Sequence, residues 1–474
     1  MEFPGDTIVC GKRTQPRGMG NLDGRELGIM SKRYSRRAFL QGSTAAAGVA
    51  ALTGAPFVLA QQSPADKLRV AVIGVAGMGG YSMVSALREQ LVAIADVDET
   101  KIAKAMKDSV KEQAKPRIFY DYRKMLDECR NDIDVVLIAT PDHHHAPAAI
   151  RAIREGKHVF CQKPLAHNIA ECYALAKAAR EKKVLTQMGN QGYCGEAIRR
   201  VAEYIAAGAI GAVTETHTIL DRNFGGTGGR PASKPVPAGL HWNEWIGPAP
   251  YRDYHDGLHP FSWRDWKAFG TGTIGDMACH RVAFPFMALR LWEVKEFTVE
   301  CIHTKNGSEE KYPQDNVVCY HIPARSDFPA CKCYVYDHQK LRPEVMKELE
   351  RKYQTKWSGE STLFVGAKGY LDNHARVIPE SEHRKCPVPP KTLVRAKAGG
   401  PVEDLYACIR SGGAPVSNFT DAGGPLTAMA LTGHLAQYAG IGGRIEWDVE
   451  KMQCTNKPEL NRFVRREYRS GWEV

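Results

Sequence analysis

Lys163 has the residue type and the setting for proton transfer. It precedes Pro164 in the stretch Cys161-Gln162-Lys163-Pro164, which ends a β-rich run. A second positive charge nearby, together with partial burial, would lower the pKa of this lysine and make it a usable base. The alternative is an exposed loop lysine without a chemical role.

Asp276 and His280 form a second candidate pair. They lie four residues apart in the glycine-rich stretch 269–280, which leads into a predicted helix, so they would share one helix face. The carboxylate could then fix the tautomer of the imidazole and stabilise its charged form, as a proton-transfer pair requires. The alternative is an N-capping aspartate beside a core histidine.

A glycine-rich turn, Gly74-Val75-Ala76-Gly77-Met78-Gly79-Gly80, follows a β-rich run that ends at Ile73. Against the pattern G-x-G-x-x-G its slots hold Gly74, Ala76 and Gly79. The first glycine permits a tight turn and the third permits close helix packing, so that the helix N-terminus can hold a pyrophosphate. Ala76 departs from the pattern where the backbone must approach the phosphate.

Asp96 ends the second β-rich run, about twenty residues beyond the glycine turn. A carboxylate at this position can accept hydrogen bonds from both ribose hydroxyls and would repel a 2′-phosphate, so it favours NAD over NADP. The alternative is an aspartate that caps a helix or closes a turn, and Asp98 is a competing candidate for the ribose.

Two further segments end predicted strands, where open α/β sheets bind their ligands. They are Ala139-Thr140-Pro141-Asp142-His143-His144-His145 and Gln187-Met188-Gly189-Asn190-Gln191-Gly192. The three consecutive histidines suggest a metal site. Consecutive residues cannot easily converge on one ion, however, and no acid-rich partner motif is nearby, so we expect no metal.

The elements that must position these residues follow two patterns. β-rich runs at 68–73, 91–95, 135–139, 158–161 and 184–187 alternate with helical stretches at 102–111, 146–155 and 170–182, which predicts a doubly wound parallel sheet. Later β-like runs at 213–220, 297–303, 317–322, 331–336 and 361–365, with helices at 282–290, 401–410 and 422–438, predict an α/β domain with an open, mostly antiparallel sheet. We place the domains at 61–190 and 191–474.

Residues 1–60 predict a twin-arginine export signal. The basic cluster Lys32-Arg33-Tyr34-Ser35-Arg36-Arg37 precedes an uncharged, alanine-rich stretch that ends in Val58-Leu59-Ala60, a small-residue cleavage site. We therefore expect the protein to be exported folded to the periplasm or another extracytoplasmic space. The alternative is an uncleaved membrane anchor. No other run of 18 apolar residues occurs, so we expect no stable membrane insertion after cleavage.

The composition suits a two-domain globular protein rather than a nucleic-acid-binding protein. The 474 residues exceed one ordinary core. The net charge of +11 includes no block of five or more Lys or Arg interleaved with aromatic residues, so we expect no nucleic-acid partner. The 13 cysteines have irregular spacings without a CxxC pair, so we interpret most of them as buried core thiols.

Together these motifs resemble those of the Gfo/Idh/MocA family (glucose–fructose oxidoreductase, inositol dehydrogenase, MocA). The resemblance covers residues 66–474, and Met188-Gly189-Asn190-Gln191 with Glu446-Trp447-Asp448 resembles exported members. It implies a Rossmann domain, a C-terminal α/β domain whose open sheet forms homodimer or homotetramer contacts, and a nicotinamide cofactor. The cofactor-binding residues that it implies are Gly74, Ala76, Gly77, Met78, Gly79, Asp96, Thr140, Pro141, His145, Gln162, Lys163 and Asn190.

The same resemblance implies Lys163, Asp276 and His280 as catalytic residues. Gln162 replaces the usual glutamate of the family, which removes a charge that would help to tune Lys163. The function expected is an NAD-dependent oxidoreductase that removes a hydride from a sugar, sugar derivative or polyol hydroxyl, with Lys163 and His280 as acid and base.

Export changes the expectation about the cofactor. No NAD pool exists outside the cytoplasm, so the enzyme should bind NAD tightly and regenerate it within one catalytic cycle. Coupled oxidation and reduction of two sugars would achieve this, and so would redox-neutral glycoside cleavage through a transient keto sugar. A third alternative is a non-catalytic sugar- or NAD-binding protein.

The aromatic residues between His241 and Trp266 suit the mixed apolar and polar faces of sugars. The alternative is a loop that packs on its own sheet. We expect Tyr193, Trp263 and Arg264 as substrate contacts.

Overall fold

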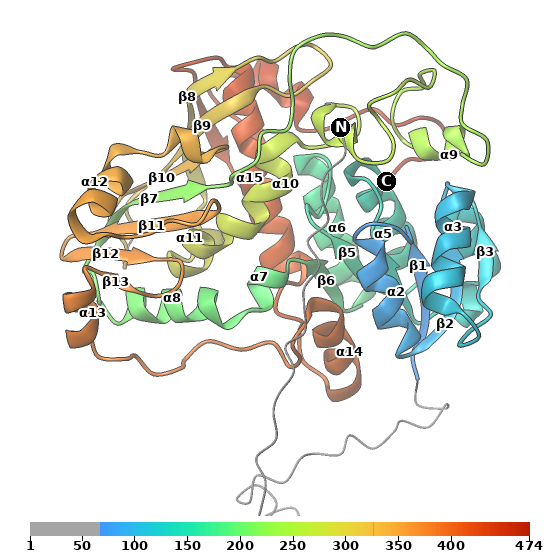
Figure 1. Ribbon diagram of the computed structural model, residues 1–474, viewed down its shortest axis with the longest axis horizontal. Helices are drawn as coiled ribbons and strands as arrows, with labels where there is room; N and C mark the ends of the chain where they lie inside the picture. Colours follow the sequence, from blue (N-terminus) through green and yellow to red (C-terminus); the bar gives the residue numbers. More distant parts are fainter. Residues whose placement is uncertain (1–66, 326) are drawn as a thin grey trace, which may run out of the picture. The chain divides into compact units, whose positions relative to one another are not determined.

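The computed structural model describes residues 67–325 and 327–474, and the predicted export signal lies outside them. Their strands form two sheets (Figure 1). Among these residues no helix combines the length and the apolar character needed to cross a bilayer.

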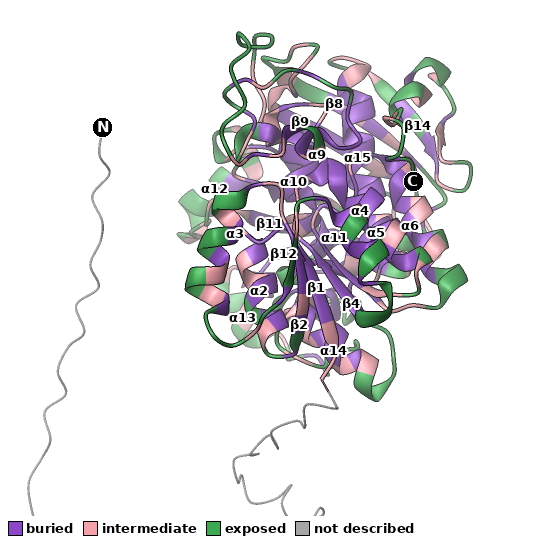
Figure 2. Ribbon diagram, turned by 90° about the vertical axis from the view of Figure 1, so that its right-hand side faces the viewer, coloured by how far each residue is buried: buried purple, intermediate pink, exposed green. Residues whose placement is uncertain are grey.

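The first sheet is parallel and doubly wound, with strand order β3-β2-β1-β4-β5-β6. Its strands are β1 Arg69–Ile73, β2 Gln90–Ala95, β3 Arg117–Phe119, β4 Val135–Ile138, β5 His158–Gln162 and β6 Thr186–Gly189. The helices between them are α2 Gly79–Leu87, α3 Glu99–Ala105, α4 Tyr122–Glu128, α5 His145–Arg154 and α6 Ile169–Lys182. The central strands are apolar and buried on both faces, as parallel sheets require (Figure 2).

The second sheet has strand order β13-β12-β11-β7-β10-β9-β8-β14-β15 and is antiparallel except between β7 and β10. Its strands are β7 Val213–Ile219, β8 Glu296–Lys305, β9 Gln314–Ile322, β10 Cys331–Tyr336, β11 Ser361–Gly366, β12 Gly369–Asp372, β13 Val377–Ile378, β14 Arg444–Asp448 and β15 Gln453–Cys454. The two sheets confirm the predicted fold class.

The remaining helices are α7 Gln191–Cys194, α8 Glu196–Ala206, α9 Trp242–Ile246, α10 Gly272–Arg281, α11 Ala283–Ala288, α12 Glu344–Tyr353, α13 Glu380–Lys385, α14 Pro401–Ser411 and α15 Gly424–Tyr438. Helix α15 is apolar on nearly all sides, and it packs against α6, α10 and β8. A helix of this composition belongs in a core, and α15 joins the two sheets.

Several elements differ from the sequence prediction. The predicted helix 102–111 is α3 followed by a π-helical turn, Met106–Val110. The predicted helix 282–290 is α11, which continues α10 after a break at Val282. Strands β12, β13 and β15 and helix α12 were not predicted, because strands of two to four residues carry too little alternation to be recognised and α12 is mostly exposed.

Two segments from the end of the chain pack on the first sheet. Val402, Leu405 and Tyr406 of α14 share a core with Val72 and Phe160, and Trp472 contacts Tyr122. The core of the predicted N-terminal domain therefore includes residues from beyond its predicted end at 190.

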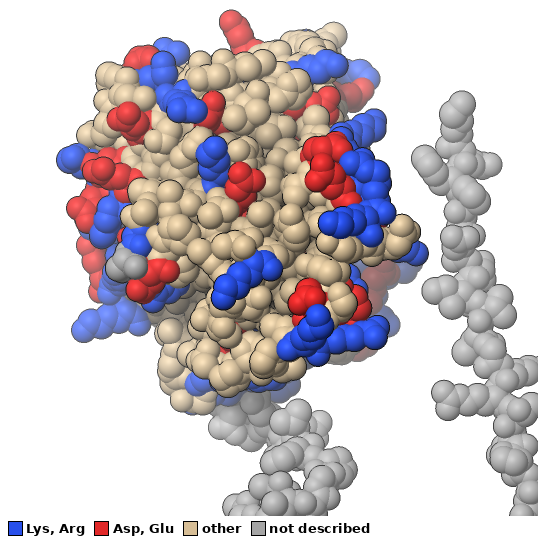
Figure 3. Space-filling model, turned by 90° about the vertical axis from the view of Figure 1, so that its left-hand side faces the viewer, with Lys and Arg blue, Asp and Glu red and all other residues tan. Residues whose placement is uncertain are grey.

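Of the cysteines in the described residues, none is in a disulfide, and all except Cys194 and Cys386 are buried. This confirms the interpretation of most of them as core thiols. The surface over the second sheet carries basic and acidic side chains interspersed with wide uncharged areas (Figure 3).

Candidate active site

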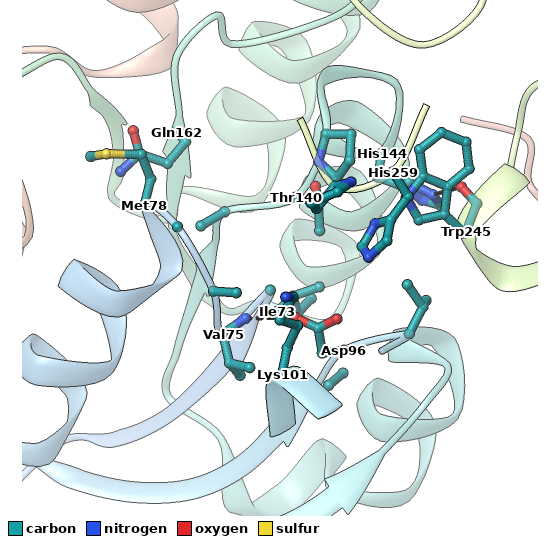
Figure 4. A pocket seen from close by; sticks show the side chains of 18 of the residues that line it. Ile73, Val75, Met78, Asp96, Lys101, Thr140, His144, Gln162, Trp245 and His259 are labelled. Carbon is teal, nitrogen blue, oxygen red and sulfur yellow. Dashed lines mark hydrogen bonds between the residues drawn. The ribbon is translucent and has the colours of Figure 1, made fainter. Parts of the chain in front are cut away.

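A cavity of about 790 Å³ lies at the carboxyl end of the first sheet. The residues that follow β1, β2, β4 and β5 line it, and so do residues from the long connection between β7 and α10. We call this connection, residues 220–271, the strap. Figure 4 shows Met78 and Gln162 on one side of the cavity and Trp245 and His259 of the strap on the other.

The glycine turn has the geometry that the sequence predicts. Gly74 has φ +83°, and a Cβ there would lie 2.5 Å from Ala139 O. A Cβ on Gly79 would collide with Gly74 O, so the start of α2 packs directly on the turn. Ala76 is accommodated because the left-handed conformation falls on the next residue, Gly77, with φ +58°.

Asp96 and Asp98 have different roles. Asp96 lines the cavity, and its carboxylate accepts hydrogen bonds from Val75 N at 2.9 Å and Asp98 N at 3.1 Å (Figure 4). Burial raises the pKa of Asp96. Asp98 instead caps α3 by accepting from Thr100 N at 2.9 Å. The capping role considered for Asp96 thus belongs to Asp98.

Polar atoms without a partner surround the cavity. Thr140 Oγ1 and both amide atoms of Gln162 are buried, and neither side chain has a hydrogen bond among the described residues. Both residues line the cavity, as does Pro141. Buried polar groups are nearly always satisfied in folded proteins, so these atoms fit a site for a polar ligand such as a dinucleotide.

The three consecutive histidines hold the backbone around the cavity. His143 Nε2 and His144 Nε2 each lie 2.9 Å from Trp245 O in the strap. The ring of His145 lies between Pro164 O at 2.7 Å and Thr140 O at 2.9 Å. Burial lowers the pKa of His144 to about 3 and that of His145 to about 4. Within the described residues no cluster of His, Cys, Asp or Glu side chains is arranged to hold a metal ion.

His145 does not line the cavity, in contrast to its predicted place beside the cofactor. It fixes the loops after β4 and β5 that carry Thr140 and Lys163. Gly79 and Asn190, which were also predicted to bind the cofactor, are likewise not among the residues that line the cavity.

Charged side chains converge at the end of the cavity formed by β4 and β5. Lys163 Nζ donates to Asp276 O at 3.0 Å and pairs with Asp276 Oδ1 at 3.2 Å. The side chain of Lys163 is 14% exposed, which agrees with the expected partial burial. Arg264 of the strap lies 3.5 Å from the same carboxylate and stacks on the ring of Trp263.

The predicted Asp276–His280 pair is not formed, although both residues lie on α10. His280 Nδ1 instead contacts Asn190 Oδ1 at 3.3 Å. Burial, followed by the charge of Lys163, lowers the pKa of His280 to about 3. Two cations attract Asp276 more strongly than a neutral imidazole can, and this explains the difference.

The aromatic segment forms a small core of its own, in which Trp242 stacks on Trp245 with their ring centroids 4.7 Å apart. Most rings of this segment therefore pack against one another instead of facing a ligand. Trp263 and Arg264, predicted to contact the substrate, do line the cavity. Tyr193, the third predicted contact, lies in the main core.

The strap is fastened to the loop after β2. His259 Nε2 lies 2.9 Å from Asp98 Oδ2, and His241 Nε2 lies 2.9 Å from Glu99 Oε1. The ring of His241 also stacks on Tyr120, with a centroid distance of 4.2 Å. The strap therefore covers the end of the cavity at which Asp96 lies.

Several residues that line this cavity had no assigned role in the sequence interpretation, among them Asp142 and Trp472. Asp142 was visible at a strand end but had no assigned role. Trp472 reaches the cavity only through the tail of the chain, and no local pattern indicates this. His259 lies in the aromatic segment that was considered for sugar binding, and it lines the cavity as part of the strap.

Residues 68–190 match a family model described as an oxidoreductase family with an NAD-binding Rossmann fold. Residues 197–289 match the model of the C-terminal alpha/beta domain of an oxidoreductase family.

Curated relatives match over a limited part of their length. Glycosyl hydrolase family 109 protein 1 of Shewanella sp. (strain ANA-3) is 33% identical over 168 residues, which is 30% of this chain and 36% of the relative. Levoglucosan dehydrogenase of Pseudarthrobacter phenanthrenivorans is 32% identical over 161 residues, 34% of this chain and 33% of the relative. The chain spans about a third of the length of these relatives.

Solved structures are similar over most of the chain. The WlbA dehydrogenase from Bordetella pertussis, in complex with NADH and UDP-GlcNAcA, has a TM-score of 0.52 at 16% identity and covers 80% of this chain and 98% of its own. An aldose-aldose oxidoreductase from Caulobacter crescentus has a TM-score of 0.52 at 18% identity and covers 81% and 100%. At these identities the likeness shows the fold.

Proposed function

Residues 68–190 and 197–289 belong to the Gfo/Idh/MocA oxidoreductase family, and from this premise we propose that the protein oxidises a hydroxyl group of a sugar, sugar derivative or polyol with NAD. One observation carries the proposal. A single cavity extends from the glycine turn and Asp96 at one end to Lys163 at the other, and Asp276 holds Lys163 from behind the lining.

The residues of the cavity fit a dinucleotide. The backbone of Gly74, Ala76, Gly77 and Met78 would face the pyrophosphate, with the N-terminus of α2 behind it. Asp96 would accept hydrogen bonds from the ribose hydroxyls. The amide of Gln162 and the hydroxyl of Thr140, which are without a partner among the described residues, would supply further contacts. The bound NAD would supply a hydride acceptor at the reactive end.

At that end Lys163 supplies a positive charge beside the hydroxyl to be oxidised. Its ammonium group is held by Asp276, so it can donate a hydrogen bond to the substrate oxygen and stabilise negative charge on it. The geometry favours Lys163 over His280 as the group that contacts the substrate oxygen. His280 contacts Asn190 and does not line the cavity.

The test is a substitution that removes this charge. We expect Lys163→Met to lower kcat by about 100-fold or more on any sugar that the unaltered protein turns over, with NADH affinity kept within a few-fold. Lys177→Met is the control, because Lys177 is exposed and its one ion pair among the described residues is with Glu181 on α6. Near-native turnover by Lys163→Met, or a protein that does not bind NADH at all, would refute the proposal.

A second candidate is redox-neutral glycoside cleavage through a transient keto sugar. The match to a relative named glycosyl hydrolase family 109 protein favours it. The two functions differ in stoichiometry: a dehydrogenase accumulates one NADH for each product, whereas cleavage yields product without net NADH.

We further propose that the protein is exported folded, on the basis of Arg36-Arg37 and the uncharged stretch behind them. Fusion of residues 1–66 to a folded reporter tests this, with Arg36→Lys/Arg37→Lys as control.

A homodimer or homotetramer through the second sheet is also proposed, and the uncharged areas of that surface support it (Figure 3).

A further inference from the structure

We propose that Asp142 is the group that accepts the proton of the substrate hydroxyl. The inference rests on the proposed oxidation of a hydroxyl group and deepens it by naming the base. It assigns different tasks to the two residues at the ends of neighbouring strands, a charge-stabilising one to Lys163 and a proton-accepting one to Asp142.

Asp142 is placed for contact with a ligand at the reactive end. It follows Thr140 and Pro141 at the end of β4 and lines the same cavity as Lys163 and Arg264. Its side chain is buried, with the residue 1% exposed. The residue therefore touches the cavity at its wall, while protein covers almost all of its surface.

The carboxylate of Asp142 is oriented by one contact. Thr271 Oγ1 donates to Asp142 Oδ2 at 2.7 Å. Thr271 is in turn fixed at the start of α10, where its carbonyl accepts from His434 Nε2 at 2.9 Å. Among the described residues no hydrogen bond reaches Asp142 Oδ1, which leaves this oxygen for a ligand.

The surroundings of Asp142 suit a carboxylate that gains and loses a proton near neutral pH. Burial raises the pKa of Asp142 to about 7, and repulsion by Asp276 adds to this effect. The hydrogen bond from Thr271 and the charges of Arg264 and Lys163 act in the opposite direction. The thiols of Cys161 and Cys279 and the hydroxyl of Tyr312 also lie within its electrostatic reach. A base is most effective when its pKa lies near the working pH.

The other two candidates are less suited to accept a proton. Lys163 Nζ donates to the carbonyl oxygen of Asp276 and pairs with its carboxylate, so the contacts of this group are those of a donor. His280 does not line the cavity, and its pKa is lowered to about 3, so a proton on its ring is strongly disfavoured near neutral pH. Asp142 is the remaining acid-base group next to Lys163 in the lining.

The proposed step balances as follows. The O–H bond of the substrate breaks, and the proton forms a new O–H bond on Asp142 Oδ1. The electron pair left on the substrate oxygen forms the C=O bond as the carbon gives up its hydride to the bound pyridine dinucleotide. Asp142 ends neutral, which removes its repulsion with Asp276.

One experiment needs no substrate, because the oxidised nicotinamide ring is cationic and the reduced ring is neutral. Ionised Asp142 should favour NAD⁺ over NADH. For the unaltered protein we expect the ratio of the two dissociation constants to shift about fivefold towards NAD⁺ between pH 6 and pH 8, as a one-unit difference in the pKa of Asp142 between the two complexes requires. Asp142→Asn should abolish this pH dependence.

Asp337→Asn is the matched control. Asp337 is another fully buried carboxyl group whose pKa burial raises, to about 8, but it does not line the cavity. Its substitution should leave the pH dependence of the NAD⁺/NADH ratio unchanged. A ratio that does not vary with pH in the unaltered protein, or that varies equally in Asp142→Asn, would overturn the proposal.

The second experiment measures turnover of an identified sugar. We expect Asp142→Asn to lower kcat by about 10²- to 10⁴-fold and to remove the acidic limb of the kcat/KM profile near pH 7. Asp142→Glu should keep that limb. An asparagine at position 142 can still accept the hydrogen bond from Thr271 Oγ1. If the role of Asp142 were purely structural, the pH profile of kcat/KM would therefore be unchanged in Asp142→Asn.

The two proposals fail in distinguishable ways. An unaltered protein that binds NAD but turns over no sugar or polyol refutes the proposed function. Normal turnover of a sugar by the unaltered protein, with the same kcat and acidic limb in Asp142→Asn, refutes the role of Asp142 alone. Absence of nucleotide binding would refute both.

Discussion

The turn after β1 depends on one residue, Gly74. Its φ of +83° lies in the left-handed region, and Ala139 O leaves no room for a side chain. Gly80, six residues later, is the second residue of α2, and no atom lies within 4 Å of the position that a Cβ would take there. The conformation and the surroundings of Gly74 exclude a side chain, whereas the surroundings of Gly80 leave room for one.

Gly74→Ala should therefore lower the free energy of unfolding by at least about 2 kcal/mol, because it combines backbone strain with a steric clash. It should also weaken NADH binding, since the turn must shift. Denaturant unfolding and NADH fluorescence titration measure the two effects.

Gly80→Ala serves as the control for stability. It should leave the free energy of unfolding unchanged or raise it by about 0.5–1 kcal/mol, because alanine restricts the unfolded chain at a position whose conformation it can adopt. Equal losses in both variants would show that the clash at Gly74 is not what matters.

The strap is an element that closes the cavity at the Asp96 end. Two histidine–carboxylate contacts hold it to the loop after β2 and to the start of α3, and a ring stack holds it to Tyr120 after β3. Both contacts are partly exposed to solvent, so each contributes about 1 kcal/mol or less. Together they should slow the opening of this end.

The double variant His241→Ala/His259→Ala should release NADH about tenfold faster, in keeping with the loss of about 1–2 kcal/mol. Stopped-flow displacement of NADH by excess NAD⁺ measures the dissociation rate.

His321→Ala is a suitable control, because His321 makes the same kind of contact with Glu300 on the second sheet. An unchanged dissociation rate in the double variant would mean that the strap does not gate the nucleotide.

At the scale of the whole molecule, the last residues of the chain complete the first domain. Trp472 is 4% exposed and packs edge-on against Tyr122 and His144. Arg123 lies 3.7 Å over its ring. Because Trp472 also lines the cavity, the tail is part of both the core and the site.

Trp472→Ala should lower the free energy of unfolding by about 3–5 kcal/mol, the usual cost of removing a buried tryptophan, and should weaken NADH binding. Denaturant midpoints and fluorescence titration give the two values.

Trp292→Ala, at a position that is 43% exposed, should cost less than about 1 kcal/mol. If both tryptophan variants were equally stable, the packing of the tail would contribute nothing to the fold in solution.

The elements that could be predicted from the sequence are those that residues close together in the chain determine. Buried parallel strands are continuous apolar runs, and the glycine turn after β1 was recognisable because its conformation requires glycine at Gly74. The set of strand ends around the cavity followed, because parallel strands bring their carboxyl ends to one edge. Lys163, Gln162 and Thr140 were found in this way.

Which of these groups interact depends on the tertiary structure. Asp276 pairs with Lys163 rather than with His280 because two cations, one from β5 and one from the strap, converge on it. The raised pKa of Asp142, the closure by the strap and the place of Trp472 likewise depend on elements far apart in the chain. Burial and Coulomb attraction act through space, so residue spacing along the sequence does not encode them.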